Sequence, residues 1–152
     1  MKNNRGFIEL KSVSDYWEKL LFDYQVLKKN PENSYYGFNF FVTAYHLLDW
    51  IFEGKYSDER TELNKTPALK ICNHIANGVK HFEPNRHGSV KEINKLRVYE
   101  EGVFEEGVFE SPIMIQLGDE FRPQLGEFIS ITEFSDYVID FWKNELNNRN
   151  LI

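Results

Sequence analysis

Polar side chains recur every three or four residues in two stretches of the chain that are otherwise rich in apolar residues. The first set comprises Asn39, Thr43, His46, Asp49 and Glu53. The second set comprises Lys70, His74, Asn77 and His81, with Asn73 and Lys80 beside them. Because residues three or four apart lie on one face of a helix, each set predicts a polar stripe. If the two helices pack together, the stripes could face each other across a cleft.

Five residues of these stripes are the candidates for acid–base chemistry: His46, Asp49, Asn77, Lys80 and His81. His46 and Asp49 are one helical turn apart, which suits a general base and the carboxylate that orients it. Lys80 is the cation that could stabilise the charge developing on a phosphodiester. In the structural alternative, His46 is hydrogen-bonded within the core and the polar residues of the second helix face water.

The sequence does not favour a metal or another cofactor. His74 and His81 are two turns apart, or roughly 10 Å along a helix that rises about 1.5 Å per residue, so they cannot chelate one ion together. His46, Asp49 and one histidine of the second helix could do so, but the ExxH pairs of di-metal helical bundles are absent. Cys72 lies on an apolar stripe, and neither a Gly-x-Ser-x-Gly motif nor a phosphate-binding glycine loop is present.

Four helices are predicted to position these residues. The first covers 14–29, with Ser12 or Ser14 as its N-cap, and the second covers 38–52. Apolar residues surround the second helix on almost every side, so we expect it to be central. The third begins with Thr66 as N-cap and Pro67 at the first helical position, and it ends at 83–85.

The last helix begins with a capping box formed by Ser130 and Glu133. Between the third and last helices, the pattern over 90–117 is more typical of strands, and 113–117 reads as a strand that reaches a turn. A direct repeat, EEGVF at 100–104 and again at 105–109, is interpreted as an extension of a hairpin. Residues 55–65 are expected to be a loop.

The predicted fold is therefore mainly α. It is an up-and-down bundle of about four helices in a single domain over 1–152, with a β-hairpin inserted before the last helix. The chain has 152 residues, of which 41% are hydrophobic and 16% aromatic. Because aromatic residues are enriched at protein interfaces, we expect a homo-oligomer or a protein partner.

The charge is unevenly distributed along a chain whose net charge is −6. Residues 63–97 hold seven lysines and arginines against two acids, whereas 98–140 hold eleven acids against Arg122. Internal charge pairing explains this distribution better than general nucleic-acid binding, so RNA is only a secondary candidate partner. No signal peptide is evident, and the apolar stretch 38–52 is too polar to span a bilayer. We expect a cytoplasmic protein that does not engage a membrane.

Three segments carry a resemblance to a known group of proteins: 44–51 (AYHLLDWI), 72–81 (CNHIANGVKH) and 138–142 (VIDFW). They resemble segments of uncharacterised bacterial helical proteins, a group similar in layout to the HEPN superfamily of helical bundles. That superfamily is rich in toxin and defence ribonucleases. The resemblance implies a HEPN-like helical domain.

HEPN ribonucleases carry an arginine followed by a histidine after four to six residues. No arginine lies at that distance before any histidine of this chain, and Lys80 with His87 has the spacing but the wrong cation, with Pro84 between them. We therefore expect a non-enzymatic HEPN-like interaction protein of a bacterial defence or toxin–antitoxin-type system. The alternative is a divergent, metal-independent ribonuclease that uses the five candidate residues, and a small-molecule-binding bundle is a third possibility.

Overall fold

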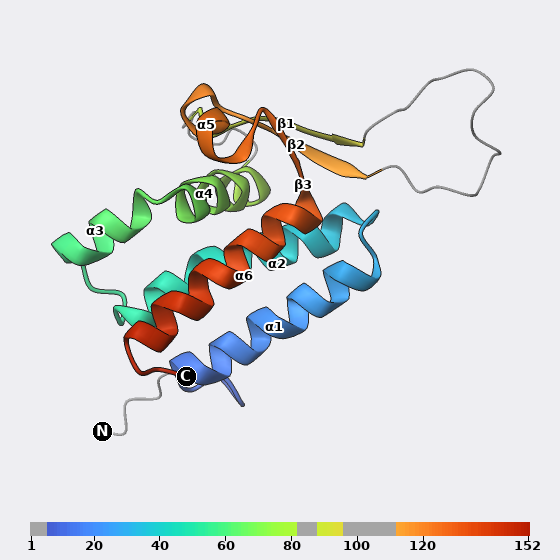
Figure 1. Ribbon diagram of the computed structural model, residues 1–152. Helices are drawn as coiled ribbons and strands as arrows, with labels where there is room; N and C mark the ends of the chain where they lie inside the picture. Colours follow the sequence, from blue (N-terminus) through green and yellow to red (C-terminus); the bar gives the residue numbers. More distant parts are fainter. Residues whose placement is uncertain (1–5, 82–87, 96–111) are drawn as a thin grey trace, which may run out of the picture.

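The computed structural model describes residues 6–81, 88–95 and 112–152, and Figure 1 shows a mainly helical protein with a small antiparallel sheet at one end. The four long helices are α1 (Val13–Lys29), α2 (Ser34–Ile51), α4 (Pro67–Lys80) and α6 (Ile131–Asn148). The short helices are α3 (Asp58–Asn64), α5 (Arg122–Leu125) and the 3-10 turn η1 (Asp119–Phe121). The strands are β1 (Val90–Lys95), β2 (Ile113–Leu117) and β3 (Phe128–Ser130).

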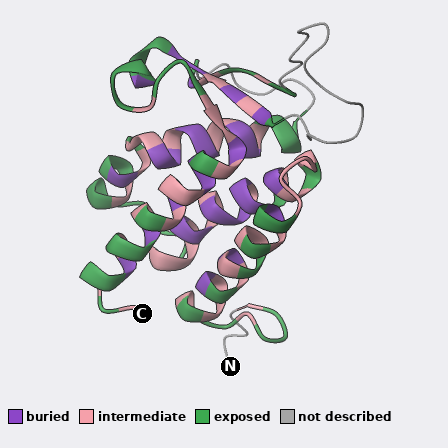
Figure 2. Ribbon diagram, turned by 45° about the vertical axis from the view of Figure 1, so that its right-hand side comes forward, coloured by how far each residue is buried: buried purple, intermediate pink, exposed green. Residues whose placement is uncertain are grey.

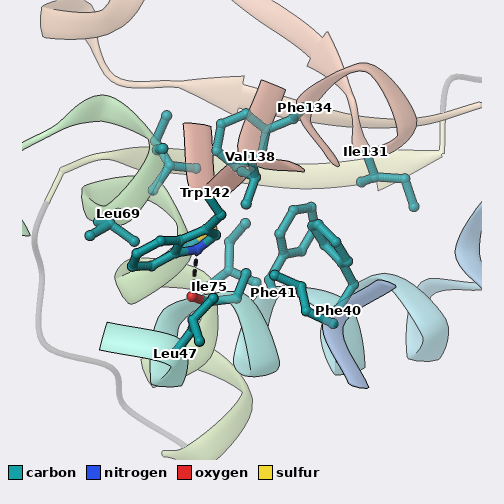
Figure 3. Packing of buried hydrophobic residues seen from close by; sticks show 14 of the residues in the cluster. Phe40, Phe41, Leu47, Leu69, Ile75, Ile131, Phe134, Val138 and Trp142 are labelled. Atoms are coloured by element: carbon teal, nitrogen blue, oxygen red, sulfur yellow. Dashed lines mark hydrogen bonds between the residues drawn. The ribbon is translucent and has the colours of Figure 1, made fainter. Parts of the chain in front are cut away.

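Helix α2 is the central element, because it contacts α1, α4 and α6. Its apolar residues supply much of the core, including Phe40, Phe41 and Leu47. Figure 3 shows these side chains in one cluster with Trp142 of α6, which lies beside Leu47. The indole nitrogen of Trp142 donates a buried hydrogen bond of 2.9 Å to the carbonyl oxygen of Ala44. This bond fixes α6 to the middle of α2.

Local capping signals determine where the helices begin. Ser12 with Asp15 forms a capping box at the start of α1, and Ser130 with Glu133 forms the predicted capping box of α6. Pro67 occupies the first turn of α4 as predicted. Thr66 is the N-cap residue there, but its hydroxyl donates to the carbonyl oxygen of Leu63 and does not cap the helix.

Two of the predicted helix boundaries are wrong. Helix α2 begins four residues earlier than predicted, at Ser34, because the Asn33 side chain accepts a hydrogen bond from the amide of Tyr35. Helix α4 ends at Lys80, ahead of the predicted end, with His81 as its C-cap.

The prediction of a loop over 55–65 is also wrong, because this stretch contains α3. The Ser57 side chain accepts a hydrogen bond from the amide of Arg60, and Asp58 and Glu59 lie in the first turn, where the helix dipole favours acids. Helix α3 places Arg60 beside the end of α2.

The three strands form an antiparallel sheet in the order β1-β2-β3. Alternate residues of β2 are buried, and Ile115 pairs with Ile93 of β1 and with Ile129 of β3. Strands β1 and β2 pair in an antiparallel arrangement, and the third strand, β3, was not predicted. The EEGVF repeats at 100–109 lie outside the described residues.

Figure 2 shows buried positions concentrated where the long helices meet and along β2. In the part of the chain that the structure describes, no helix is long and apolar enough to cross a bilayer.

Candidate functional site

The polar stripe of α2 faces α1. The hydroxyl of Thr43, which is 3% exposed, donates a hydrogen bond of 2.6 Å to Asp23 and accepts one of 2.7 Å from Lys19. Asn39 lines a small hollow with Phe22 and Asp23, which also belong to α1. Part of this stripe therefore joins two helices.

The polar stripe of α4 contacts η1 and strand β1. Lys70 forms an ion pair of 2.8 Å with Glu120, and Nδ1 of His74 accepts a hydrogen bond of 3.0 Å from the amide of Val90. Asn77 donates to Asn73 on its own helix. The sequence left open whether the two stripes face each other across a cleft, and in the structure these residues contact different neighbours.

Apolar residues fill the space between α2 and α4 instead. Leu47 of α2 belongs to the same buried cluster as Leu69 and Ile75 of α4 (Figure 3). Cys72 of α4 is fully buried, and burial raises the pKa of its thiol far above the ordinary value. This thiol is therefore unsuited to act as a nucleophile.

The five candidate residues lie at two ends of the bundle. Phe38, near the start of α2, shares a hollow with Gly78 and Val79 at the end of α4. His46 is eight residues beyond Phe38, which is about 12 Å along a helix axis.

His46 and Asp49 are consequently together, whereas Asn77, Lys80 and His81 belong to the other end. Lys80 and His81 are exposed there, at the last residue and the C-cap of α4. The structure does not bring the five residues together into one site.

Asp49 connects His46 to an arginine that the sequence did not associate with it. One carboxylate oxygen lies 3.3 Å from Nδ1 of His46, and the other accepts a hydrogen bond from the guanidinium of Arg60. Arg60 also donates to the carbonyl oxygen of Lys55 and lies over the ring of Tyr56, with its Cζ 5.5 Å from the ring centroid. These contacts hold α3 against the end of α2.

His46 and Arg60 differ in how far their side chains are exposed to solvent. His46 is 46% exposed, so the expectation of a buried core histidine is wrong. Arg60 is only 17% exposed and has its positive charge paired with Asp49. The arginine could not be found by the HEPN spacing, because it follows His46 and belongs to a different helix. The acidic residues that directly follow Ser57 were the sequence signal from which helix α3 could have been predicted.

Asp49 also borders a cavity of about 430 Å³ near the start of α1, which it lines with Lys11, Trp50, Lys55 and other residues. Trp50 stacks on Tyr16 with ring centroids 4.9 Å apart. Burial raises the pKa of Tyr16 to about 12, with the charges of Asp23 and Asp49 contributing, so its hydroxyl stays protonated. Cationic side chains, acidic side chains and the aromatic ring of Trp50 therefore line this cavity.

A second hollow of about 480 Å³ lies between the start of α2, the end of α4 and strand β1, and we call it the α4–β1 groove. It is lined by Tyr35, Phe38, His74, Ile75, Gly78, Val79, Val90, Lys91 and Ile93. Tyr35 is 75% exposed and Val79 is 48% exposed. Large apolar side chains are thus presented to solvent within a concave surface.

Within the described ranges, no group of three histidine, cysteine or acidic side chains is placed to hold a metal ion. No protein-family model matches the chain, and neither does any curated protein or solved structure. The functional interpretation therefore depends on the geometry of these surfaces.

Proposed function

We propose that the protein is a non-enzymatic, HEPN-like interaction protein of a bacterial defence or toxin–antitoxin-type system, and that it binds a protein partner at the α4–β1 groove. The observation that carries this proposal is the exposure of Tyr35 and Val79 within an apolar hollow. Concave apolar surfaces of this kind mark interaction sites, and buried aromatic anchors supply much of the energy of such contacts.

The arrangement of the candidate catalytic residues supports a binding role over a catalytic one. Asp49 is bonded to Arg60, which limits the freedom of either group to act on a substrate. Lys80 and His81 lie at the other end of the bundle from His46. A general acid and a general base at that separation cannot act on one phosphodiester.

The arrangement of the long helices is part of the same proposal. We interpret α1, α2, α4 and α6 as an up-and-down bundle, with the paired strands β1 and β2 inserted before α6. This is the layout that the HEPN resemblance implies. A cytoplasmic location follows from the proposed system.

Co-expression with the proteins encoded beside its gene tests this function. We expect a partner to co-purify with the wild-type protein but not with a Tyr35→Ser/Val79→Ser variant. Phe128→Ser is the matched control, because Phe128 is 55% exposed but lies on β3, at the opposite edge of the sheet. Equal retention of the partner by the groove variant contradicts the proposal.

A divergent, metal-independent ribonuclease is the second candidate function. The observation in its favour is that Asp49 lies between His46 and Arg60, which provides a cation that the sequence around His46 lacks. RNA cleavage by the wild-type protein in the presence of EDTA, lost in both His46→Ala and Arg60→Lys, is the result that favours this alternative. We expect no such cleavage.

A further inference from the structure

Strand β1 forms one edge of the sheet. It pairs with β2, which lies between β1 and β3, and no other strand among the described residues pairs with it. An edge strand presents main-chain amides and carbonyls that can pair with an added strand. The β1 edge is therefore a potential docking element in its own right.

The α4–β1 groove runs beside this edge. His74 accepts the hydrogen bond of the Val90 amide, which holds the end of α4 against the beginning of β1. Ile93 pairs with the buried Ile115, so these two side chains lie on the same face of the sheet, toward the helices. A strand added beyond β1 would place every second side chain on that face, over the exposed Tyr35 and Val79.

Cations are concentrated around this edge. Lys91 and Lys95 belong to β1, and Lys80 is the last residue of α4. Lys91 is paired with Asp119 at 2.9 Å, and Glu92 is the one acid within β1. The remaining positive charge favours an acidic partner segment.

We propose that the occupant of the α4–β1 groove is an extended segment of a partner protein, which pairs with β1 as a fourth strand. Its apolar side chains enter the groove at alternate positions, and its acidic side chains lie near Lys80 and Lys95. This inference rests on the proposed function for the location of the partner. It adds the mode of recognition, which is β-strand addition, and the chemistry of the segment.

Three synthetic peptides test the inference by fluorescence polarisation. The first alternates valine with glutamate over eight residues, the second replaces every glutamate with lysine, and the third repeats the first with alternate main-chain amides methylated. We expect the glutamate peptide to bind at least ten times more tightly than the lysine peptide. Methylation should abolish binding, because it removes the amide donors that strand pairing needs.

Two protein variants localise the effect. Lys80→Glu/Lys95→Glu should weaken binding of the glutamate peptide by fivefold or more, and the difference should shrink in high salt. Lys143→Glu, an exposed charge reversal on α6, should leave binding unchanged. The amides of 92–95 should exchange with solvent more slowly in the bound protein.

Several outcomes overturn the inference: no binding of the glutamate peptide at millimolar concentration, equal binding of the glutamate and lysine peptides, or undiminished binding of the methylated peptide. None of these outcomes decides whether a partner uses the groove, because the co-purification with Tyr35→Ser/Val79→Ser answers that question separately.

Discussion

The main-chain amide of Val90 donates a hydrogen bond of 3.0 Å to Nδ1 of His74. Because Nδ1 is the acceptor, the neutral imidazole carries its proton on Nε2. This bond connects the edge strand β1 to α4 and borders the α4–β1 groove. A histidine that the sequence placed in a polar stripe therefore joins the sheet to the helices.

Replacing His74 with alanine should loosen β1. The lost acceptor leaves a half-buried amide unsatisfied, so the free energy of unfolding should fall by about 1–2 kcal/mol. Amide exchange measured by NMR should accelerate most at Val90. His81→Ala is the control, because His81 is exposed at the C-cap of α4. Unchanged exchange at Val90 in the His74 variant would show that the bond does not hold the strand.

His46→Ala should change the free energy of unfolding by less than about 0.5 kcal/mol, since the side chain is nearly half exposed. Asp49→Ala should lower it by about 1 kcal/mol or more, because Arg60 loses its carboxylate while it is mostly buried. Urea denaturation of the two variants measures both effects. A larger loss for His46→Ala than for Asp49→Ala contradicts this account.

Features of the fold that depend only on residues close together in the sequence could be predicted from it. Ser130 and Glu133 contact each other across one turn, so their residue types and spacing suffice to place the start of α6. Glycine disfavours a helix, yet α2 extends through Gly37 to begin at Ser34. In the structure, a Cβ at Gly37 would lie 3.2 Å from Cδ1 of Ile131, so glycine allows α2 to approach α6 closely.

The direction in which a stripe faces could not be predicted. Helical spacing determines which residues share a face, but the packing of distant segments determines what that face meets. Thr43 meets Asp23 of α1, and His74 meets Val90 of β1, and neither contact has a local signal. The pairing of Asp49 with Arg60 depends likewise on the path of the chain between α2 and α3.

Thr43→Val should destabilise the contact between α1 and α2. Valine has the same shape as threonine but cannot donate to Asp23 or accept from Lys19, so the free energy of unfolding should fall by about 1–3 kcal/mol. Thr61→Val, at an exposed position of α3, should cost less than about 0.5 kcal/mol. Thermal denaturation that ranks the two variants in the opposite order would contradict the role of Thr43.

Tyr24 should titrate at unusually high pH. The hydrogen bond of 2.6 Å that its hydroxyl donates to Asp136 raises the pKa to about 12, and burial and the charges of Asp136 and Asp140 add to the effect. A raised pKa stabilises the folded protein fully below about pH 10, and this contribution is lost as the pH rises through 12.

Ultraviolet titration of the tyrosines measures this effect. Asp136→Asn should shift one step from about pH 12 toward 10, whereas Asp140→Asn should shift it little, because Asp140 makes the smallest contribution. The pKa of Tyr16 is also raised to about 12, so the comparison is made with Tyr16 replaced by phenylalanine. A step near pH 12 in Tyr16→Phe that persists unchanged in Tyr16→Phe/Asp136→Asn contradicts the assignment to Tyr24.

Asp136 should make the stability of the folded protein depend on pH at the acidic end of the range. Burial acts to raise the pKa of its carboxyl, but the hydrogen bonds from Lys28 and Tyr24 outweigh it and hold the pKa below the ordinary value. The contribution is therefore present above about pH 4 and is lost as the pH falls further. Asp136→Asn should flatten the decline of stability below pH 4, and an unchanged decline would contradict this.

The location of the partner is the central claim, and hydrogen–deuterium exchange of the purified complex tests it most directly. We expect the partner to slow exchange at the start of α2 around Tyr35, at the end of α4 around Val79 and along β1. Exchange around His46, Asp49 and Arg60 should not change. Protection confined to those three residues, with none at the α4–β1 groove, would contradict the account.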